Sequence, residues 1–263
     1  MRIAVAATAP IGADLLERLA ARHELAYLLT RPDAARGRGR SVAPPPAKEA
    51  AQRLGIAVHQ PERPELPEPV DAVIVCAYGI YIPPALLEQA LWVNVHPSLL
   101  PRWRGAAPVE RAILAGDEQT GVTIHRTVEA LDAGPVAAQE AFPIGADDDA
   151  GTIFARSAEV AARLLDEVLP APSFTPQPEE GMTYAEKIGS ADRELELSDP
   201  VDAWRRVRAL SPHIGAWGTL NGKRVIVWRA RLDDGVFVPV EVQPEGRKRM
   251  SYDEFLRGAR GHH

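Results

Sequence analysis

The first 170 residues alternate short apolar runs with longer segments in which apolar residues recur every three to four positions. Short runs rich in Val, Ile and Ala predict strands, and the longer periodic segments predict helices. We expect strands at 2–7, 24–30, 56–61, 72–79, 92–97, 121–128 and 135–144, and helices at 13–23, 45–55, 83–91, 107–117 and 152–169. This alternation predicts an α/β fold with a Rossmann-like parallel sheet covered by helices on both faces.

The pattern changes after a proline-rich, polar stretch at 171–181, which we interpret as a linker. A short helix is expected at 201–210. Two strand-like runs then flank Asn221-Gly222, a dipeptide typical of two-residue hairpins, and a further strand is expected at 236–243. We therefore predict a domain at 1–170, a linker at 171–181 and a smaller β-rich domain at 182–263.

Composition narrows the classes of protein to consider. The chain of 263 residues is 46% hydrophobic and 25% charged, as globular proteins are. Its single cysteine, Cys76, excludes an intramolecular disulfide framework and a cysteine-rich zinc site, and its apolar surroundings predict a buried side chain. The histidines have no metal-binding spacing, and no apolar run approaches the ~20 residues that span a bilayer. We expect a cytoplasmic protein without a metal.

Polar residues follow one predicted strand, in the stretch NVHPSLLPRWRG at 94–105. Asn94 and His96 are two residues apart, so they share one face of the strand, at the carboxyl end where ligands bind in such sheets. An asparagine amide can donate to an oxyanion, and a histidine can do so when protonated or can move a proton. Asp132, in the loop ALDAGP, is the best candidate for a third group that orients the imidazole.

None of these three side chains is a good nucleophile, which suits a reaction whose substrate supplies one, such as acyl or formyl transfer to an amine. The alternative is a structural histidine at a strand end. The first strand–helix turn, AATAPIGA, is not GxGxxG, which disfavours a nicotinamide dehydrogenase.

An arginine-rich loop is the second informative stretch. In RPDAARGRGRSVAPPPAKEAA at 31–51, Arg36, Arg38 and Arg40 alternate with small residues, and the stretch has no obvious fold of its own. Arginine forks match phosphate, so this loop could bind a nucleic-acid backbone, or it could be a solvated loop. Residues 201–263 are net basic in a chain of net charge −6, which favours nucleic acid.

The stretch from 94 to 140 resembles the folate-dependent formyltransferases in its asparagine, its HxSLLP element, its TGVTIH strand and its LDxGP loop. The arginine loop and the tail, at 184–188 and 242–258, resemble the members of this family that act on initiator tRNA. The resemblance implies that a formyl group passes from 10-formyltetrahydrofolate to the α-amine of methionyl-initiator tRNA, and we expect a monomer.

The resemblance also implies roles for residues. Asn94 and His96 would stabilise the tetrahedral oxyanion, and Asp132 would orient a water and the imidazole and relay protons. The pterin would be held by Ala77, Tyr78, Gly79, Ile80, Ile82, Ser98, Leu99, Leu100 and Pro101. The tRNA would be contacted by Arg36, Arg38, Arg40 and Lys187, with Arg38 at the acceptor stem.

Two alternatives stay open. One is a formyltransferase for a small amine, such as a nucleotide-linked amino sugar or glycinamide ribonucleotide. The glycinamide ribonucleotide enzymes lack the arginine loop and a second domain, so we rank the small-amine hypothesis below transfer to initiator tRNA. The other is an RNA-binding protein without catalysis. The second domain resembles an OB-like barrel, but it is shortened, and we expect a strand pair to be missing between Leu232 and Val236.

Overall fold

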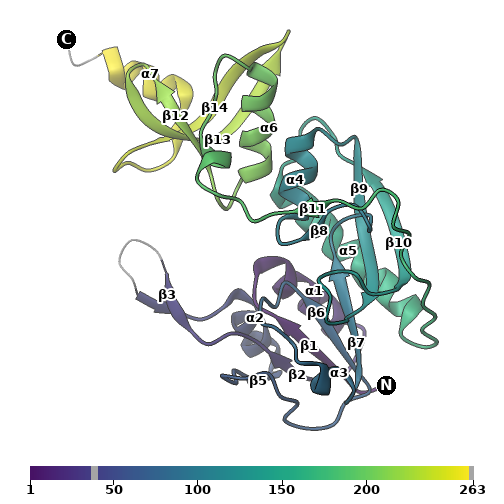
Figure 1. Cartoon of the computed structure of the whole chain (residues 1–263). Helices are drawn as coiled ribbons and strands as arrows, with labels where there is room; N and C mark the ends of the chain where they lie inside the picture. Colours follow the sequence, from purple (N-terminus) through teal and green to yellow (C-terminus); the bar gives the residue numbers. More distant parts are fainter. Residues whose placement is uncertain (37–40, 261–263) are drawn as a thin grey trace. The chain divides into compact units, whose positions relative to one another are not determined.

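The computed structural model describes residues 1–36 and 41–260, which form two compact units (Figure 1). Unit 1 contains residues 1–104, 121–142 and 154–183, and unit 2 contains 105–120, 143–153 and the chain from 184 onward. The chain therefore passes between the units several times. The predicted domain boundary at 171–181 stays a prediction.

Unit 1 is built on a seven-stranded sheet with the order β10-β9-β7-β6-β1-β2-β5. The pairs from β7 to β5 are parallel, which confirms the predicted sheet type, but β9 runs antiparallel to β7. The strands are β1 (Ile3–Ala7), β2 (Leu25–Leu29), β5 (Ala57–His59), β6 (Ala72–Cys76), β7 (Leu91–His96), β9 (Gln119–Arg126) and β10 (Val136–Pro143). Fully buried runs such as β1 and β6 are typical of strands with both faces covered.

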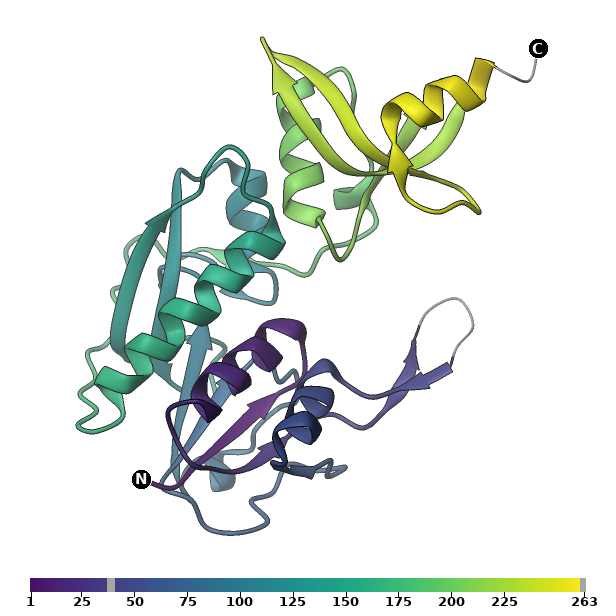
Figure 2. The ribbon, with the colours of Figure 1, turned by 180° about the vertical axis from the view of Figure 1, so that it is seen from behind.

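Proline opens three helices of this region, as suits a first turn that needs no N–H. They are α1 (Pro10–Ala20), α2 (Pro46–Leu54) and α3 (Pro84–Leu87); α5 (Ala150–Val168) is the longest helix described. Helices α1 and α2 lie side by side over one face of the sheet (Figure 2). A Cβ at Gly12 would lie 2.6 Å from Ala7 Cβ and 2.8 Å from Cys76 O, so this glycine lets α1 approach β1 and β6.

One predicted helix is shorter than expected, and the prediction for the cysteine is confirmed. The helix predicted at 83–91 ends at Leu87, and the last of those residues, Leu91, begins β7. Cys76 is buried as predicted, and burial raises the pKa of its thiol to about 12.

The arginine-rich loop has more structure than its sequence suggested. Strands β3 (Ala34–Arg36) and β4 (Ser41–Ala43) pair antiparallel, so the interpretation as a stretch with no fold of its own is wrong for these residues. Arg38, Arg40 and the side chain of Arg36 lie outside the described residues, and their predicted contact with tRNA stays a prediction.

Unit 2 contains an antiparallel sheet with the order β12-β13-β14-β15. Its elements are α4 (Pro108–Ala115), η1 (Ala191–Arg193), α6 (Pro200–Leu210), β12 (Ala216–Leu220), β13 (Lys223–Asp233), β14 (Val236–Pro244), β15 (Met250–Ser251) and α7 (Tyr252–Arg260). Short strands β8 (Arg104–Gly105) and β11 (Tyr184–Ala185) pair with each other. The hairpin predicted at Asn221-Gly222 is confirmed.

A second tight turn explains why the second domain is short between Leu232 and Val236. Asp234 and Gly235, with φ of +49° and +80°, join β13 directly to β14. The two strands therefore form one long ribbon with no further strand pair between Leu232 and Val236, as the sequence predicted. In the described part of the chain, no helix combines the length and hydrophobicity that a bilayer crossing needs.

Candidate active site

The carboxyl ends of β6 and β7 meet at one edge of the sheet because the two strands are parallel neighbours. Asn94 and His96 end β7, and the register of β9 places His125 directly opposite Asn94. Cross-strand partners share a face, so the three side chains lie together. The rings of His96 and His125 are 6.3 Å apart between centroids.

Asp132 lies between these groups. Its Oδ1 accepts a hydrogen bond from Asn94 Nδ2 at 3.2 Å and is 3.6 Å from His125 Nε2, while its Oδ2 is 3.6 Å from His96 Nδ1. Its side chain is only 11% exposed. The structure thus brings together the three side chains that the sequence nominated, and it adds His125.

The hydrogen bonds of His125 determine how Asn94 is oriented. His125 Nδ1 is 3.0 Å from Arg126 O, and a carbonyl only accepts, so Nδ1 carries the hydrogen. The neutral ring then accepts at Nε2 from Asn94 Nδ2, at 3.0 Å. Both amide hydrogens of Asn94 are therefore engaged, one by His125 and one by Asp132.

The same reasoning fixes the tautomer of His96. Its Nε2 is 2.8 Å from Trp103 O and donates to it, so in the neutral ring Nδ1 carries the lone pair, toward Asp132. Burial lowers the pKa of His96, and the Asp132 carboxylate opposes this shift by raising the pKa. The ring is thus neutral near pH 7 and can accept a proton at Nδ1, where a carboxylate would stabilise the resulting imidazolium.

The backbone around the site is conformationally strained. Ala77, Trp103 and Asp132 have φ of +48°, +65° and +47°, a region that residues with a Cβ adopt rarely and at a cost of about 1–3 kcal/mol. Trp103 supplies the carbonyl that accepts from His96, Asp132 supplies the carboxylate, and Ala77 begins the turn that is predicted to hold the pterin. Such strain persists only where neighbouring contacts hold it.

The segment from Ala77 to Ile82 follows β6. Tyr78 and Ile82 are buried in the hydrophobic core with Leu86 and Trp92, so their side chains serve packing. Thr8 Oγ1 donates to Tyr78 O at 2.8 Å, and Arg31 Nη2 donates to Gly79 O at 2.5 Å. Ala77 and Gly79 are exposed and Ile80 is half-buried.

The segment Ser98–Pro101 follows β7 and is held rigidly. Ser98 Oγ donates to Arg102 O at 2.7 Å. Leu100 N donates to Thr123 Oγ1 at 3.1 Å, and Gln139 Nε2 donates to Leu100 O at 3.0 Å. Ser98 and Leu100 are buried, whereas Leu99 and Pro101 are half-buried. Together with the turn after β6, this segment lines the edge that holds Asn94 and His96.

Two residues of the site were missed by sequence reasoning. His125 lies in a predicted strand, but only its antiparallel pairing with β7 brings it to Asn94. Gln177 lies in the predicted linker, and its Nε2 donates to Asp132 O and Gly134 O, both at 2.8 Å. A glutamine in a proline-rich stretch carries no local signal for such a role.

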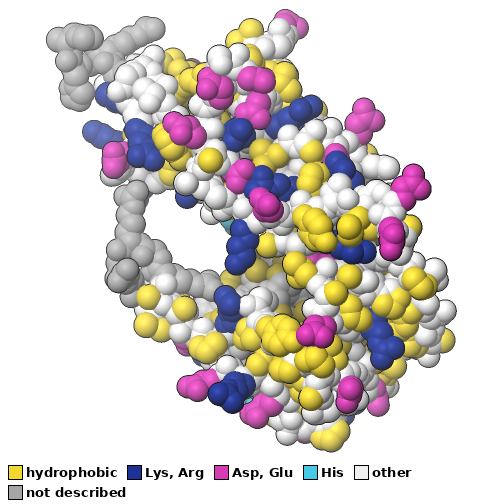
Figure 3. Space-filling model, viewed as in Figure 1, with side chains coloured by type: hydrophobic (Ala, Val, Ile, Leu, Met, Phe, Trp, Pro, Cys, Tyr) yellow, Lys and Arg dark blue, Asp and Glu magenta, His cyan; other side chains and the backbone are white. Residues whose placement is uncertain are grey.

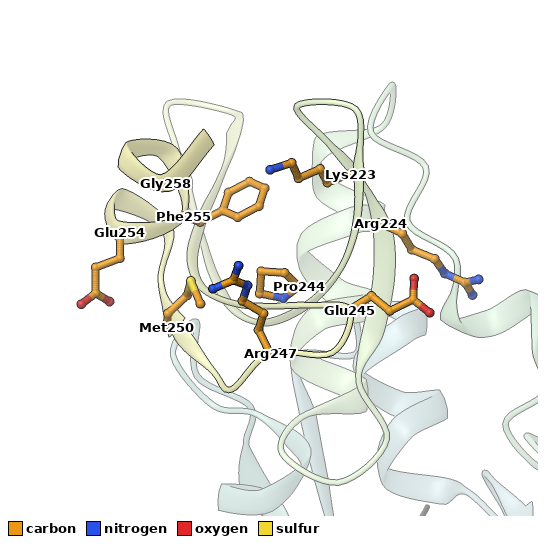
Figure 4. A pocket seen from close by; sticks show the side chains of 9 residues that line it. All are labelled: Lys223, Arg224, Pro244, Glu245, Arg247, Met250, Glu254, Phe255 and Gly258. Atoms are coloured by element: carbon orange, nitrogen blue, oxygen red, sulfur yellow. The ribbon is translucent and has the colours of Figure 1, made fainter. Parts of the chain in front are cut away.

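Unit 2 has a separate cavity of about 650 Å³ (Figure 4). Lys223 and Phe255 point toward one another across it, Arg247 enters from the side of Pro244, and Glu254 points away. Within the described residues, neither Lys223 nor Arg247 has an ion-pair partner.

Lys187, predicted to contact tRNA, is exposed elsewhere in this unit, and its carbonyl accepts from Arg111 Nη2 at 3.1 Å.

Comparisons with known proteins identify the family. The family model described as formyl transferase matches residues 1–169. A methionyl-tRNA formyltransferase of Paracoccus denitrificans is 39% identical over 291 residues, covering 98% of this chain and 97% of the relative. The alignment therefore includes the second unit as well as the matched region.

Solved structures share the fold. HypX from Aquifex aeolicus in complex with tetrahydrofolic acid aligns with a TM-score of 0.71 at 20% identity, over 98% of this chain and 47% of HypX. The methionyl-tRNA formyltransferase from Clostridium thermocellum aligns with a TM-score of 0.67 at 16% identity, over 93% of this chain and 98% of that enzyme. With the family model matching residues 1–169 and the Paracoccus relative matching almost end to end, this chain belongs to the formyl transferase family.

Proposed function

We propose that this protein transfers the formyl group of 10-formyltetrahydrofolate to the α-amine of methionine esterified to initiator tRNA. The observation that carries the proposal is the cluster of Asn94, His96 and Asp132 at the carboxyl edge of the sheet. The near full-length similarity to a methionyl-tRNA formyltransferase supports this acceptor over a small amine.

The reaction needs charge stabilisation and one proton acceptor. The amine nitrogen attacks the formyl carbon, the carbonyl oxygen becomes negative, and the bond from that carbon to the folate nitrogen breaks as the carbonyl re-forms. One proton leaves the attacking amine, and the departing folate nitrogen takes one up. Asn94 can stabilise the oxyanion once a substrate oxygen displaces one of the two acceptors of its amide hydrogens.

His96 suits the proton transfer. Its Nε2 hydrogen is held by Trp103 O, so the neutral ring has no free N–H for an oxyanion, whereas its Nδ1 can take the proton from the amine. Asp132, 3.6 Å away, then stabilises the imidazolium. This refines the expectation from the sequence, in which His96 shared the oxyanion with Asn94.

For the folate, the turn at 77–80 and the segment 98–101 would hold the pterin. The two segments flank the site on adjacent strand ends, and 98–101 is fixed by Thr123 and Gln139. Tyr78 and Ile82 would contribute through the backbone because their side chains lie in the core. An exposed turn beside half-buried apolar side chains fits a planar, polar ring.

The decisive experiment offers the purified chain 10-formyltetrahydrofolate and a panel of acceptors. We expect formylation of charged initiator tRNA, and no comparable reaction with glycinamide ribonucleotide or a nucleotide-linked amino sugar. Asn94→Ala serves as the inactive control. Transfer to a small amine in preference to tRNA would replace the proposal with the small-amine alternative, and saturable RNA binding without folate binding would favour the non-catalytic one.

The pH dependence of kcat should report His96. Because burial lowers its pKa, we expect kcat to be flat above the ordinary imidazole pKa of about 6.5 and to fall only at lower pH, as Nδ1 becomes protonated. The free energy of unfolding should change with pH in the same direction. Because the pKa of His96 is lower in the native state, the unfolded state binds more protons, and stability falls as the pH drops below about 6.5. A kcat profile and a stability profile from about pH 5 to 8 measure both, and an acid limb centred above pH 7 would contradict the assignment.

The cavity of unit 2 is a candidate contact for the RNA backbone. On the face drawn in Figure 3, basic and acidic side chains are interspersed. Binding of an RNA backbone would therefore depend on local pairs of cations more than on net charge. Lys223→Ala with Arg247→Ala should weaken tRNA binding and reduce the slope of log K against log salt by up to about two, with kcat at saturation unchanged. Salt-dependent binding titrations measure this. The control Arg163→Ala loses a cation that pairs with Glu140, and an equal loss there would refute the local contact.

A further inference from the structure

We propose that Gln177 is a positioning residue for formyl transfer, which holds the loop of Asp132 in the conformation that presents the carboxylate to Asn94 and His96. The inference rests on the proposed function. It assigns a role in the active site to a segment that the sequence presents as a linker.

The contacts of Gln177 are specific to the loop backbone. Its Nε2 donates to Asp132 O and to Gly134 O, both at 2.8 Å, so both amide hydrogens bind carbonyls of one short loop. The Asp132 side chain meanwhile reaches Asn94 and His96. A single amide therefore fixes the main chain of the residue whose carboxylate organises the site.

The loop needs such support because of its conformation. Asp132 has φ of +47°, which is unfavourable for a residue with a Cβ, and such strain persists only when surrounding contacts impose it. Without the two hydrogen bonds, the loop could relax toward negative φ. Relaxation would rotate the carboxylate and lengthen the distance from Asp132 Oδ2 to His96 Nδ1, which is 3.6 Å in the structure.

Arg104 fixes which way the Gln177 amide faces. Its Nε and Nη2 both donate to Gln177 Oε1, at 3.0 and 2.7 Å. An arginine has no acceptor atoms, so the oxygen must face it and the NH2 group must face the loop. The orientation of the amide is thus determined by donors that face its oxygen and acceptors that face its nitrogen.

The same segment also supports the His96 side of the site. Thr183 Oγ1 accepts from Trp103 N at 2.9 Å, and Trp103 O accepts from His96 Nε2 at 2.8 Å. Val136 and Thr175 form a β-bridge that holds the segment on β10. Residues 175–183 therefore contact the loops that carry both Asp132 and the partner of His96.

The test uses two variants of the full-length chain. Gln177→Met keeps the length of the side chain and removes its polar atoms, and Gln177→Glu keeps an acceptor for Arg104 while removing the donors. We expect both to lower kcat with charged initiator tRNA by about 10–100-fold, as is typical of residues that orient a catalytic group, with KM for tRNA and folate within about twofold of wild type. Gln89→Met is the matched control, because Gln89 Nε2 also donates to a carbonyl, Ala85 O at 3.2 Å, away from the site.

A double-mutant cycle separates positioning from general damage to the fold. If Gln177 acts through Asp132, Gln177→Met should cause little further loss of kcat in an Asp132→Asn background, whereas independent structural damage would multiply the two losses. Multiplicative losses, wild-type kcat in both single variants, or a loss that only follows the folded fraction measured by circular dichroism would overturn the inference.

Failure of the proposed function would look different. In that case wild-type protein would not formylate charged tRNA at all. Activity of the wild type with an unchanged Gln177→Met variant leaves the function standing and removes only the role of Gln177.

Discussion

Asp132→Asn is expected to lower kcat for formyl transfer about 10³-fold, with little change in KM. Asparagine keeps the size of the side chain and an oxygen that can accept from Asn94, but it removes the negative charge that stabilises the His96 imidazolium. Positioned acid–base groups contribute roughly 10²–10⁴-fold to a rate, which sets the scale. Steady-state kinetics with charged initiator tRNA, on protein of unchanged thermal stability, measure the effect.

Asp166→Asn is the matched control for this substitution. Asp166 also contacts a histidine, with its Oδ1 2.8 Å from His23 Nε2, and it lies on α5 outside the site. We expect its kcat to equal that of wild type. An Asp132→Asn variant with more than about a tenth of wild-type kcat would show that the carboxylate is not the group that organises the proton transfer.

Gly134→Ala is expected to destabilise the protein by about 3 kcal/mol, a fall in Tm of roughly 6–12 °C, and to abolish most of the activity. A Cβ at this position would lie 1.7 Å from Arg126 O and 3.3 Å from His125 Nδ1. A backbone carbonyl cannot turn aside as a flexible side chain can, so the loop must move, and Asp132 moves with it.

Thermal denaturation and kinetics measured on the same preparation test this prediction. At Gly189 a Cβ would meet only Asp192 Oδ2, at 3.7 Å, an ordinary contact. Gly189→Ala should therefore leave Tm and kcat close to wild type. A Gly134→Ala variant as stable and as active as this control would mean that the loop of Asp132 tolerates displacement.

Much of the fold is encoded locally. The period of apolar positions located the strands of the seven-stranded sheet, and prolines located the starts of α2 and α3. Asn221-Gly222 located a hairpin because that turn requires positive φ, which glycine and asparagine adopt most easily. These signals depend on neighbours in the chain, so they can be read without the structure.

Only part of the candidate site could be predicted from the sequence in this way. The spacing of Asn94 and His96 placed them on one face of one strand, and their position at its carboxyl end predicted a ligand site. The loop ALDAGP made Asp132 the best candidate for a third group, and the family resemblance pointed to the same residue. Neither periodicity nor motif distinguished Tyr78 and Ile82, which pack in the core, from Ala77 and Gly79, which are exposed.

The sequence alone determined most of the helices and strands, the family resemblance and three side chains of the candidate site. The tertiary structure alone decided that β9 pairs antiparallel to β7 and brings His125 to Asn94, that His96 keeps its Nδ1 lone pair toward Asp132, and that Gln177 holds the loop of Asp132. The physical reason is range. Secondary structure follows from residues a few positions apart, whereas these contacts join residues separated by tens of positions, and only the packed fold determines which of them meet.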